Sequence, residues 1–314
     1  MSTVLCVILN WRTADMTLRA AQSAITAMEG IEGAITIVDN DSQDGSFEAM
    51  REAAQNWPRV QVLQAGRNGG YGAGNNVGIR AGLPDGSKPD YVYVLNSDAF
   101  PAPDAIRALV DHLEANPKTG FAGSHIHGED GEPHTTAFRF PSIASEFEGA
   151  AKTGPISKLL KNAIIAPALP TVTTQVDWLA GASVLMRQSV LDQIGIFDET
   201  FFLYFEETDL CHRAARAGWP TDYVVESRVM HIGSVSTGMK EWQRVPSYWF
   251  SSRRHYFEKN HGRIYAFGAT VAHIAGLGVY GLRVLLQRKK PHTPPHFLRD
   301  LVKHSMGTRT SQES

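Results

Sequence analysis

The sequence predicts an α/β protein with a doubly wound, mostly parallel sheet and a helical extension at its C-terminus. Three observations support this prediction. Short apolar runs rich in β-branched and aromatic residues alternate with stretches of helical period through the first 125 residues. The runs show no polar alternation, as expected for strands that helices cover on both faces. Each of the first four runs ends in polar or glycine residues, at the sheet edge where this class of fold binds ligands.

The expected elements follow in order along the chain. We expect strands at residues 4–10, 34–39, 60–64, 91–96 and 120–124, with helices between them at about 13–28, 46–56, 72–81 and 104–116. From residue 142 to about 170 the period is lost, which indicates a flexible or lid-like insertion. A second patterned region then has a segment at 176–187, a helix to about residue 194, a helix from about residue 205, and strands near 221–225 and 229–232.

The composition is typical of a soluble globular chain large enough for one big domain or two modest ones. The chain has 314 residues, of which 43% are hydrophobic and 20% are charged. Cys6 and Cys211 fall in a predicted strand and a predicted helix, so we expect buried thiols and a reducing, cytoplasmic location. Residues 4–11 lack the features of a signal peptide and are expected to form the first strand.

Charge is distributed unevenly along the chain. From residue 250 onward there are 11 Lys and Arg against 3 Asp and Glu, a balance of +8 that leaves −10 for residues 1–249. A basic end indicates an anionic partner. We expect an anionic membrane surface rather than nucleic acid, because no RNA-binding signature accompanies the charge. Residues 264–286 could span a bilayer but contain His273 and Arg283, which favours a helix lying on the membrane. A packed helix of a soluble protein or homodimer, and a spanning helix, are the alternatives.

Polar residues after the strands define a candidate ligand site. The first two strands end in Asn10 and Asp39, the third leads into GRNGGYGAGNN at 66–76, and the fourth leads into residues 96–98. Because parallel strands end at one edge of a sheet, these groups are expected to lie together. Ordinary turn chemistry is the alternative for each of them alone, including an Asx turn at Asp39.

The glycine-rich segment 66–76 and Asp98 suggest a diphosphate and a metal ion. Glycines allow close backbone approach, and the helix that follows presents free N–H groups to an anion. The segment matches neither the Walker A pattern nor the dinucleotide-binding fingerprint, and an ordinary turn remains the alternative. A carboxylate that faces a diphosphate needs a divalent cation between them, so Asp98 is a candidate ligand for Mg²⁺ or Mn²⁺.

An acidic cluster lies downstream, in the helix expected from about residue 205. Its members are Glu206, Glu207 and Asp209. Asp209 can pair with Arg213 four residues later, whereas Glu207 has Cys211 at that distance, so Glu207 is the candidate general base. Stabilisation of the first helical turn by acidic residues is the alternative.

The second patterned region contains two further candidate positions, the segment at 178–182 and His231. Trp178 precedes the small residues Gly181 and Ala182, an arrangement suited to stacking on a sugar ring, and core packing is the alternative. His231 follows a short strand. It could have a functional role, or its imidazole could simply be hydrogen-bonded within the core or at the surface.

The order of these motifs resembles the family 2 glycosyltransferases, particularly bacterial rhamnosyltransferase-like members. The resemblance runs from about residue 4 to 260 and includes VLNSDAF at 94–100, DWLAGASVLMR at 177–187 and VMHIGSVST at 229–237. It implies a GT-A fold, a nucleotide-diphosphate-sugar donor, a divalent metal and inversion at the anomeric carbon. It also divides the chain into a donor-binding half at 1–125, an acceptor-binding and catalytic half at 126–240, and a C-terminal extension at 241–314.

The resemblance assigns roles position by position. Asp39 is similar to the nucleobase contact and Asp98 to the metal-binding member of the DxD element, in which Asn96 replaces the first carboxylate. His231 is similar to a late histidine that completes the metal site, and Glu207 to the catalytic base of the acidic pair, where Asp is frequent. The other residues expected to bind the donor are Asn10, Asn68, Gly70, Asn75, Asn96 and Ser97. Those expected to bind the acceptor are Trp178, Gly181, Ala182 and Glu206.

The resemblance implies transfer of rhamnose or a similar sugar to a saccharide or lipid-linked saccharide, in the synthesis of a cell-surface polysaccharide. We expect a cytoplasmic enzyme, peripheral on the inner face of the membrane if its C-terminal helix binds there. A sugar-nucleotide pyrophosphorylase is one alternative, although NWRTAD after the first strand lacks the glycine-rich loop of that chemistry. An inactive carbohydrate-binding or scaffold protein is the other.

Overall fold

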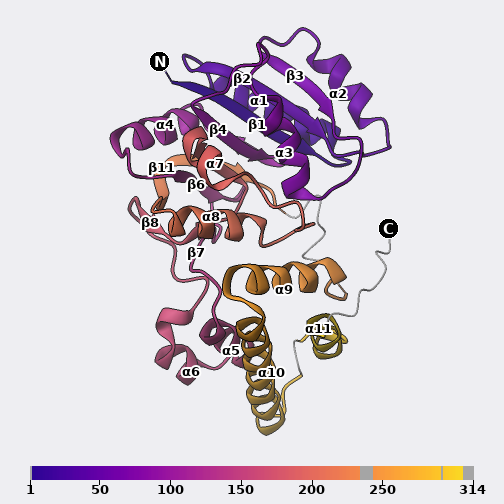
Figure 1. The fold of residues 1–314 in the computed structure, drawn as a ribbon, viewed down its shortest axis with the longest axis vertical. Coiled ribbons are helices and arrows are strands. Elements are labelled where there is room, and N and C mark those ends of the chain that lie inside the picture. The colour runs from indigo at the N-terminus through magenta and orange to yellow at the C-terminus, as the bar shows by residue number, and fades with distance from the viewer. Residues whose placement is uncertain (1, 234–242, 291–292, 307–314) are drawn as a thin grey trace. The chain divides into compact units, whose positions relative to one another are not determined.

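The computed structural model describes residues 2–233, 243–290 and 293–306 (Figure 1). The chain forms two compact units. The first comprises Met1–Phe138, Ala168–Phe202 and Glu206–Met239, and the second comprises Arg139–Pro167, Leu203–Phe205 and Lys240–Ser314. Residues 139–167, which were expected within the half at 126–240, therefore belong to the same unit as the C-terminal extension. The end of the motif at 229–237 lies outside the described residues.

The first unit contains a nine-stranded sheet, and the five strands expected in its N-terminal part are present. They are β1 (Thr3–Asn10), β2 (Glu32–Asp39), β3 (Val60–Gln64), β4 (Tyr91–Asn96) and β6 (Phe121–His127). The others are β5 (Ala99–Pro101), β8 (Thr174–Val176), β10 (Ser183–Arg187) and β11 (Thr221–His231). The order is β3-β2-β1-β4-β10-β6-β11-β5, with β8 beside β11. The strands β1 to β4 are parallel, and β10 runs antiparallel between β4 and β6.

One continuous strand replaces the two that were expected near 221–225 and 229–232. The pairing of β11 with β6 shifts register between Val224 and Arg228. Such a bulge bends a strand without ending it, which explains why the sequence suggested an interruption. The last part of β11 pairs with β5 and places His231 opposite Ala99.

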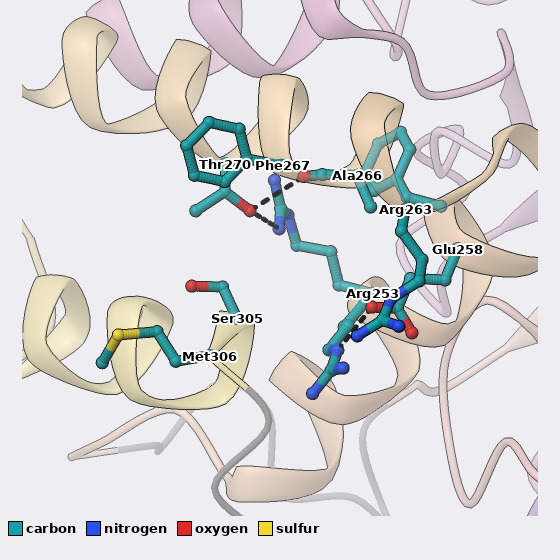
Figure 2. A pocket seen from close by; sticks show the side chains of 10 residues that line it. Arg253, Glu258, Arg263, Ala266, Phe267, Thr270, Ser305 and Met306 are labelled. Atoms are coloured by element: carbon teal, nitrogen blue, oxygen red, sulfur yellow. Dashed lines mark hydrogen bonds and ion pairs between the residues drawn. The ribbon is translucent and has the colours of Figure 1, made fainter.

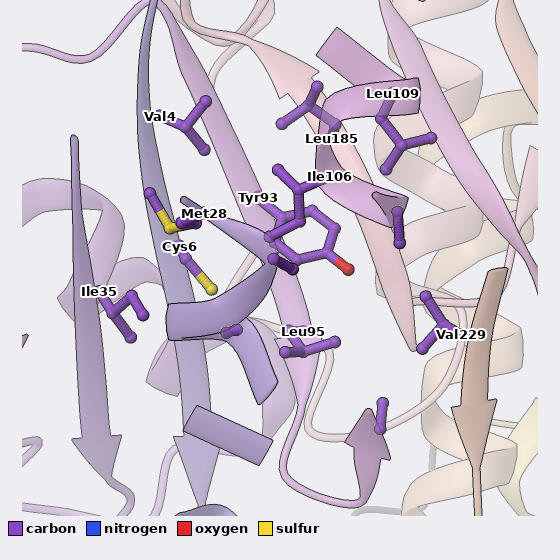
Figure 3. Close-up of a cluster of buried hydrophobic side chains, with 14 of the residues drawn as sticks. Val4, Cys6, Met28, Ile35, Tyr93, Leu95, Ile106, Leu109, Leu185 and Val229 are labelled. Carbon is purple, nitrogen blue, oxygen red and sulfur yellow. The ribbon is translucent and has the colours of Figure 1, made fainter. Parts of the chain in front are cut away.

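Helices cover both faces of this sheet, as a doubly wound fold requires. The helices α1 (Ala14–Ala27) and α4 (Ala105–Ala115) share a core with Val4, Cys6 and Ile8 of β1 (Figure 3). The helix α3 (Tyr71–Ala81) lies on the opposite face, where a Cβ added at Gly78 would be 2.6 Å from a Val7 methyl group. Glycine at this position therefore lets α3 approach the sheet closely. The remaining helices of the unit are α2 (Ser46–Ala54), α7 (Gln188–Ile194) and α8 (Glu206–Arg216).

The second unit is helical. It contains α5 (Ile143–Ala151), α6 (Gly154–Leu159), the short 3-10 turn η1 (Lys161–Ala163), α9 (Ser247–His261), α10 (Arg263–Leu286) and α11 (Phe297–Ser305). The prediction of a flexible insertion at 142–170 is wrong over α5. Reciprocal hydrogen bonds between Ser142 and Ser145 cap its start, and a Cβ at Gly276 of α10 would lie 2.6 Å from the Phe147 carbonyl oxygen. The partner that orders α5 is thus more than a hundred residues away in the sequence.

Two other expectations can be compared with the structure. Cys6 and Cys211 are free and buried, as predicted. Among the described residues, α10 is the one helix long and apolar enough to cross a membrane, with a mean hydropathy of 1.5 over its most apolar window.

Candidate functional site

The carboxyl ends of β1, β2 and β4 bring three of the predicted residues into register. Asn10 lies opposite Asp39, and the preceding residue of β1 lies opposite Asn96. Asp39 is fully buried and accepts hydrogen bonds from the Asn10 amide at 2.7 Å and from the Ser42 backbone N–H at 3.0 Å. The Asx turn that was the alternative at Asp39 is not formed, because the bonded N–H belongs to Ser42, three residues on, and Gly45 precedes α2. The Asp39 carboxylate instead holds the loop that follows β2.

The glycine-rich segment lies next to this edge and is held by Asn40, which the sequence analysis did not single out. The Asn40 amide donates to Asn68 Oδ1 at 3.0 Å and to the Gly70 carbonyl at 3.4 Å. Two buried amide oxygens nearby, Asn40 Oδ1 and Asn75 Oδ1, accept no hydrogen bond from the described residues. Buried acceptors of this kind are normally satisfied, so the segment offers acceptors that a ligand or water could use.

Asp98 and His231 meet where β4 passes into β5. The His231 Nε2 lies 3.0 Å from Asp98 Oδ1 and 3.4 Å from the Asn96 amide nitrogen. The pairing of β11 with β5 produces this contact between positions 133 residues apart. His134, which the sequence analysis missed, places its ring 6.3 Å from that of His231.

The donor set at this point is small for a divalent cation. The described residues contain no cluster of three or more His, Cys, Asp or Glu side chains that could hold a metal ion. One carboxylate and one imidazole do adjoin, and Mg²⁺ or Mn²⁺ commonly takes its remaining ligands from water and substrate phosphates. Asp98 and His231 therefore fit an ion that is shared with a bound diphosphate.

Glu207 occupies the first turn of α8 and is held through Gly181. The Gly181 N–H donates to Glu207 Oε1 at 3.1 Å, and the Gly181 carbonyl accepts from the Tyr71 hydroxyl at 2.7 Å. Tyr71 is thus a second residue that the sequence analysis missed, although it lies within the glycine-rich segment. Burial raises the pKa of the Glu207 carboxyl above its ordinary value of 4.5.

The pKa of Tyr71 responds to carboxylates of both the acidic helix α8 and the end of β4. Burial raises the pKa of its hydroxyl well above the ordinary value, and nearby carboxylates raise it further. In decreasing order of effect, these carboxylates are Glu207, Glu206 and Asp98. The Tyr71 hydroxyl therefore stays protonated, and it is linked to Glu207 through the backbone of Gly181.

The segment that enters α8 is anchored to α3. The Asn76 amide donates to the Phe197 carbonyl at 2.9 Å, and its oxygen accepts from the Phe197 N–H at 3.2 Å. The Tyr71 N–H donates to the Phe202 carbonyl at 2.9 Å. At Gly70, φ is 88° and a Cβ would lie 1.9 Å from that carbonyl oxygen, so a side chain cannot be accommodated. The glycine-rich segment thus positions the acidic helix.

The other residues expected to bind the acceptor have structural partners. Trp178 stacks on Phe138 with ring centroids 4.3 Å apart. Ala182 lies in the hydrophobic core, and its carbonyl accepts from the Asn96 N–H at 3.0 Å. Glu206 is buried, whereas Glu207 is partly exposed. Of the acidic pair, Glu207 is therefore the member that solvent can reach.

The family model for "Glycosyl transferase family 2" matches residues 7–170, more than half of the chain. The chain belongs to the family 2 glycosyltransferases. This confirms the resemblance drawn from the motifs and supports glycosyltransferase activity over the pyrophosphorylase and scaffold alternatives.

Among curated relatives, the glycosyltransferase is 35% identical over 214 residues to N-acetylglucosaminyl-diphospho-decaprenol L-rhamnosyltransferase of Mycobacterium tuberculosis, covering 65% of this chain and 68% of that one. It is 25% identical over 200 residues to rhamnosyltransferase WbbL of Escherichia coli, covering 62% of this chain and 72% of WbbL.

Two solved glycosyltransferases share the fold. GalNAc-T7 with UDP, GalNAc and Mn²⁺ gives a TM-score of 0.60 at 14% identity, covering 97% of this chain and 54% of that one. The mannosyltransferase PcManGT from Pyrobaculum calidifontis with GDP-Man and Mn²⁺ gives 0.58 at 12% identity, covering 96% and 79%. This chain thus spans about half the length of the GalNAc-T7 chain. The predicted GT-A fold is confirmed by these two structures.

Proposed function

We propose that this glycosyltransferase transfers rhamnose or a similar sugar from a nucleotide-diphosphate donor to a hydroxyl of a lipid-linked saccharide, with inversion. The observation that carries the proposal is the pair of hydrogen bonds that joins Glu207, through Gly181, to Tyr71 of the glycine-rich segment. The similarity to two rhamnosyltransferases, one named for a diphospho-decaprenol acceptor, supports the choice of sugar and acceptor. The product would enter a cell-surface polysaccharide.

Glu207 would act as the general base. A base is most effective when its pKa lies near the working pH, and burial shifts the pKa of this carboxyl in that direction. Glu207 would take the proton of the acceptor hydroxyl as that oxygen forms a bond to the anomeric carbon. The bond from this carbon to the diphosphate would break on the opposite face, and the nucleoside diphosphate would leave.

Other residues would bind and orient the substrates. Asn10 and Asp39 would hold the nucleoside, the segment at 66–76 would lie beside the diphosphate, and Trp178 would contact the acceptor sugar. Asp98 and His231 would hold Mg²⁺ or Mn²⁺, which when bound neutralises charge on the leaving diphosphate. The Gly181 N–H keeps the reactive carboxylate oriented and favours its charged form.

We further propose that the enzyme is cytoplasmic and associates peripherally with the membrane through α10. Ile264, Leu282 and Leu285 are exposed apolar residues of this helix. His273, by contrast, lies 2.6 Å from Glu146 in a charged cluster that a spanning helix would carry into the hydrocarbon. A helix lying at the interface avoids that cost.

The substitution Glu207→Gln tests the assignment of the base. The amide retains the size of the side chain but cannot take the proton, so transfer should fall by about 10²–10⁴-fold. Donor binding should persist, measured as thermal stabilisation by UDP-, GDP- and dTDP-sugars with and without Mn²⁺. Glu48→Gln, at an exposed position of α2, is the matched control and should remain fully active. Normal turnover by the Glu207→Gln variant would show that another group is the base.

A further inference from the structure

A cavity of about 200 Å³ lies within the second unit, and none of its lining residues is one of the predicted active-site residues. It is bordered by Arg253, Arg254 and Arg263, together with side chains of α9, α10 and the end of α11 (Figure 2). Three guanidinium groups thus border one cavity. The cavity is large enough for several waters or for a phosphate group.

Arg253 forms the rigid wall of this cavity. Its side chain is almost completely buried, at 2% exposed, and donates to Glu146 Oε2 at 2.8 and 3.1 Å and to Thr270 Oγ1 at 3.3 Å. It also stacks over Phe257 at 5.1 Å from the ring centroid. A guanidinium carries five N–H donors, so these three bonds leave donors that can face the cavity.

The other two arginines differ in their partners. Arg254 donates to Glu258 Oε1 at 2.8 Å and to the His304 carbonyl at 3.2 Å. Arg263 is exposed, and its side chain forms no ion pair with any residue in the described ranges. Three positive charges thus meet two carboxylates, Glu146 paired with Arg253 and Glu258, in the cavity lining, paired with Arg254. The excess positive charge and the planar donor forks suit a phosphate oxyanion.

Apolar side chains continue outward from this cationic cavity along α10. Phe267 lines the cavity and is 71% exposed, Ile264 is 90% exposed, and Val271 follows one turn later on the same face. Exposed aromatic and aliphatic residues in a row mark an interaction surface. A ligand that combines a phosphate with hydrocarbon would match both parts.

We propose that this cavity binds the phosphate of an anionic membrane phospholipid, while Ile264 and Phe267 contact the adjoining acyl chains. The proposal deepens the membrane association proposed above, and it does not depend on the chemistry at Glu207. In this proposal Arg263 contacts a specific lipid headgroup. Under diffuse electrostatic attraction, by contrast, every basic residue of the C-terminal region would contribute equally to membrane binding. The structure makes Arg263 the adaptable member, because Arg253 and Arg254 are already engaged with Glu146 and Glu258.

The experiment is co-sedimentation of the full chain with phosphatidylcholine vesicles, with and without phosphatidylglycerol. Arg263→Gln should weaken binding to the anionic vesicles about tenfold or more, as for a lost hydrogen bond to a charged group. The matched control is Arg288→Gln, an exposed residue outside the cavity, which should cost about fivefold or less, the effect of one surface charge. Equal losses in the two variants would overturn the proposal in favour of diffuse attraction.

Four further measurements keep the outcome clear. Phe267→Ser should also weaken binding to anionic vesicles, and persistence of full binding in that variant would contradict the acyl contact. If inorganic phosphate stabilises the wild type and not Arg263→Gln while vesicles do not bind, the site is for soluble phosphate and the lipid assignment is overturned. A change of oligomeric state in Phe267→Ser without vesicle binding would instead identify a dimer surface. Transfer of the sugar to a water-soluble acceptor should be unchanged in Arg263→Gln. If the wild type itself showed no transfer, that result would count against the proposed transferase function and not against the lipid site.

Discussion

Gly181 offers a sharp test of how the catalytic base is held. Its N–H and carbonyl bind Glu207 and Tyr71 on either side. A Cβ added at this position would lie 2.5 Å from the Tyr71 hydroxyl oxygen and 2.8 Å from Glu207 Oε1. The backbone of Gly181 does not have a positive φ, so alanine is strained here by contacts alone. Gly181→Ala therefore displaces the base without altering its chemistry.

The size of the effect follows from these distances. Ordinary contacts of a Cβ begin at 3.4 Å, so the Tyr71 hydroxyl must move by about 0.9 Å and the carboxylate oxygen by about 0.6 Å. A displacement of about 1 Å at a reacting group can lower the rate about 100-fold. We expect kcat to fall by roughly that factor, or about 2.7 kcal/mol in activation free energy. Overpacking should also reduce the free energy of unfolding by about 1–3 kcal/mol.

The assay is steady-state kinetics with the donor varied, together with thermal unfolding. The donor KM should change little, because the added methyl group lies beside the base. The matched control is Gly149→Ala in α5, where a Cβ would meet nothing within 4 Å. That variant should keep full activity and gain about 0.5–1 kcal/mol of stability from the helix propensity of alanine. A Gly181→Ala enzyme with wild-type kcat would refute the claim that this contact positions Glu207.

Two stability predictions follow from carboxyl groups whose pKa the fold shifts. Folding raises the pKa of the Glu207 carboxyl above 4.5, so ionisation of Glu207 destabilises the folded protein as the pH rises from 4.5 through the folded pKa. Glu207→Gln cannot ionise and should therefore unfold at a higher temperature than the wild type at about pH 8. In thermal unfolding measured over a pH series, this difference should vanish below pH 4.5. Burial alone would raise the pKa of Glu146, but Arg253 and His273 outweigh it and hold the pKa below its usual range. Glu146→Gln should cost about 3–5 kcal/mol in chemical denaturation, because it leaves Arg253 charged and buried, whereas the exposed Glu48→Gln should change stability by less than about 0.5 kcal/mol. A neutral result for Glu146→Gln would show that the ion pair contributes nothing net.

The N-terminal sheet was predictable because its signals are local. Apolar runs of five to seven residues identify strands β1 to β4 within one or two residues at each end. The helices between them carry their own period, and the polar strand ends follow from the direction of a parallel sheet. The bulge of β11 was missed because it depends on pairing with β6 and β5 rather than on its own residues.

The insertion at 142–170 and the basic cavity could not be predicted, because they depend on contacts between distant segments. The helix α5 shows no sustained apolar period in sequence, and its order comes from contact with α10. Arg253, Arg254 and Arg263 are three members of a general excess of basic residues, and nothing local separates them from Arg288. Only the crossing of α9, α10 and α11 distinguishes the arginines that border a cavity.

The sequence by itself determined the family, the sheet, the polar residues at the strand ends and the acidic cluster at 206–209, because each is written in short motifs. The tertiary structure decided how these groups combine. It placed His231 against Asp98 through a strand pairing across 133 residues, and it set Gly181 between Tyr71 and Glu207. Hydrogen bonds of this kind depend on the positions of three separate segments, which no local pattern encodes. The same is true of the pKa of Glu207, since burial by neighbouring segments, and not the residue type, raises it.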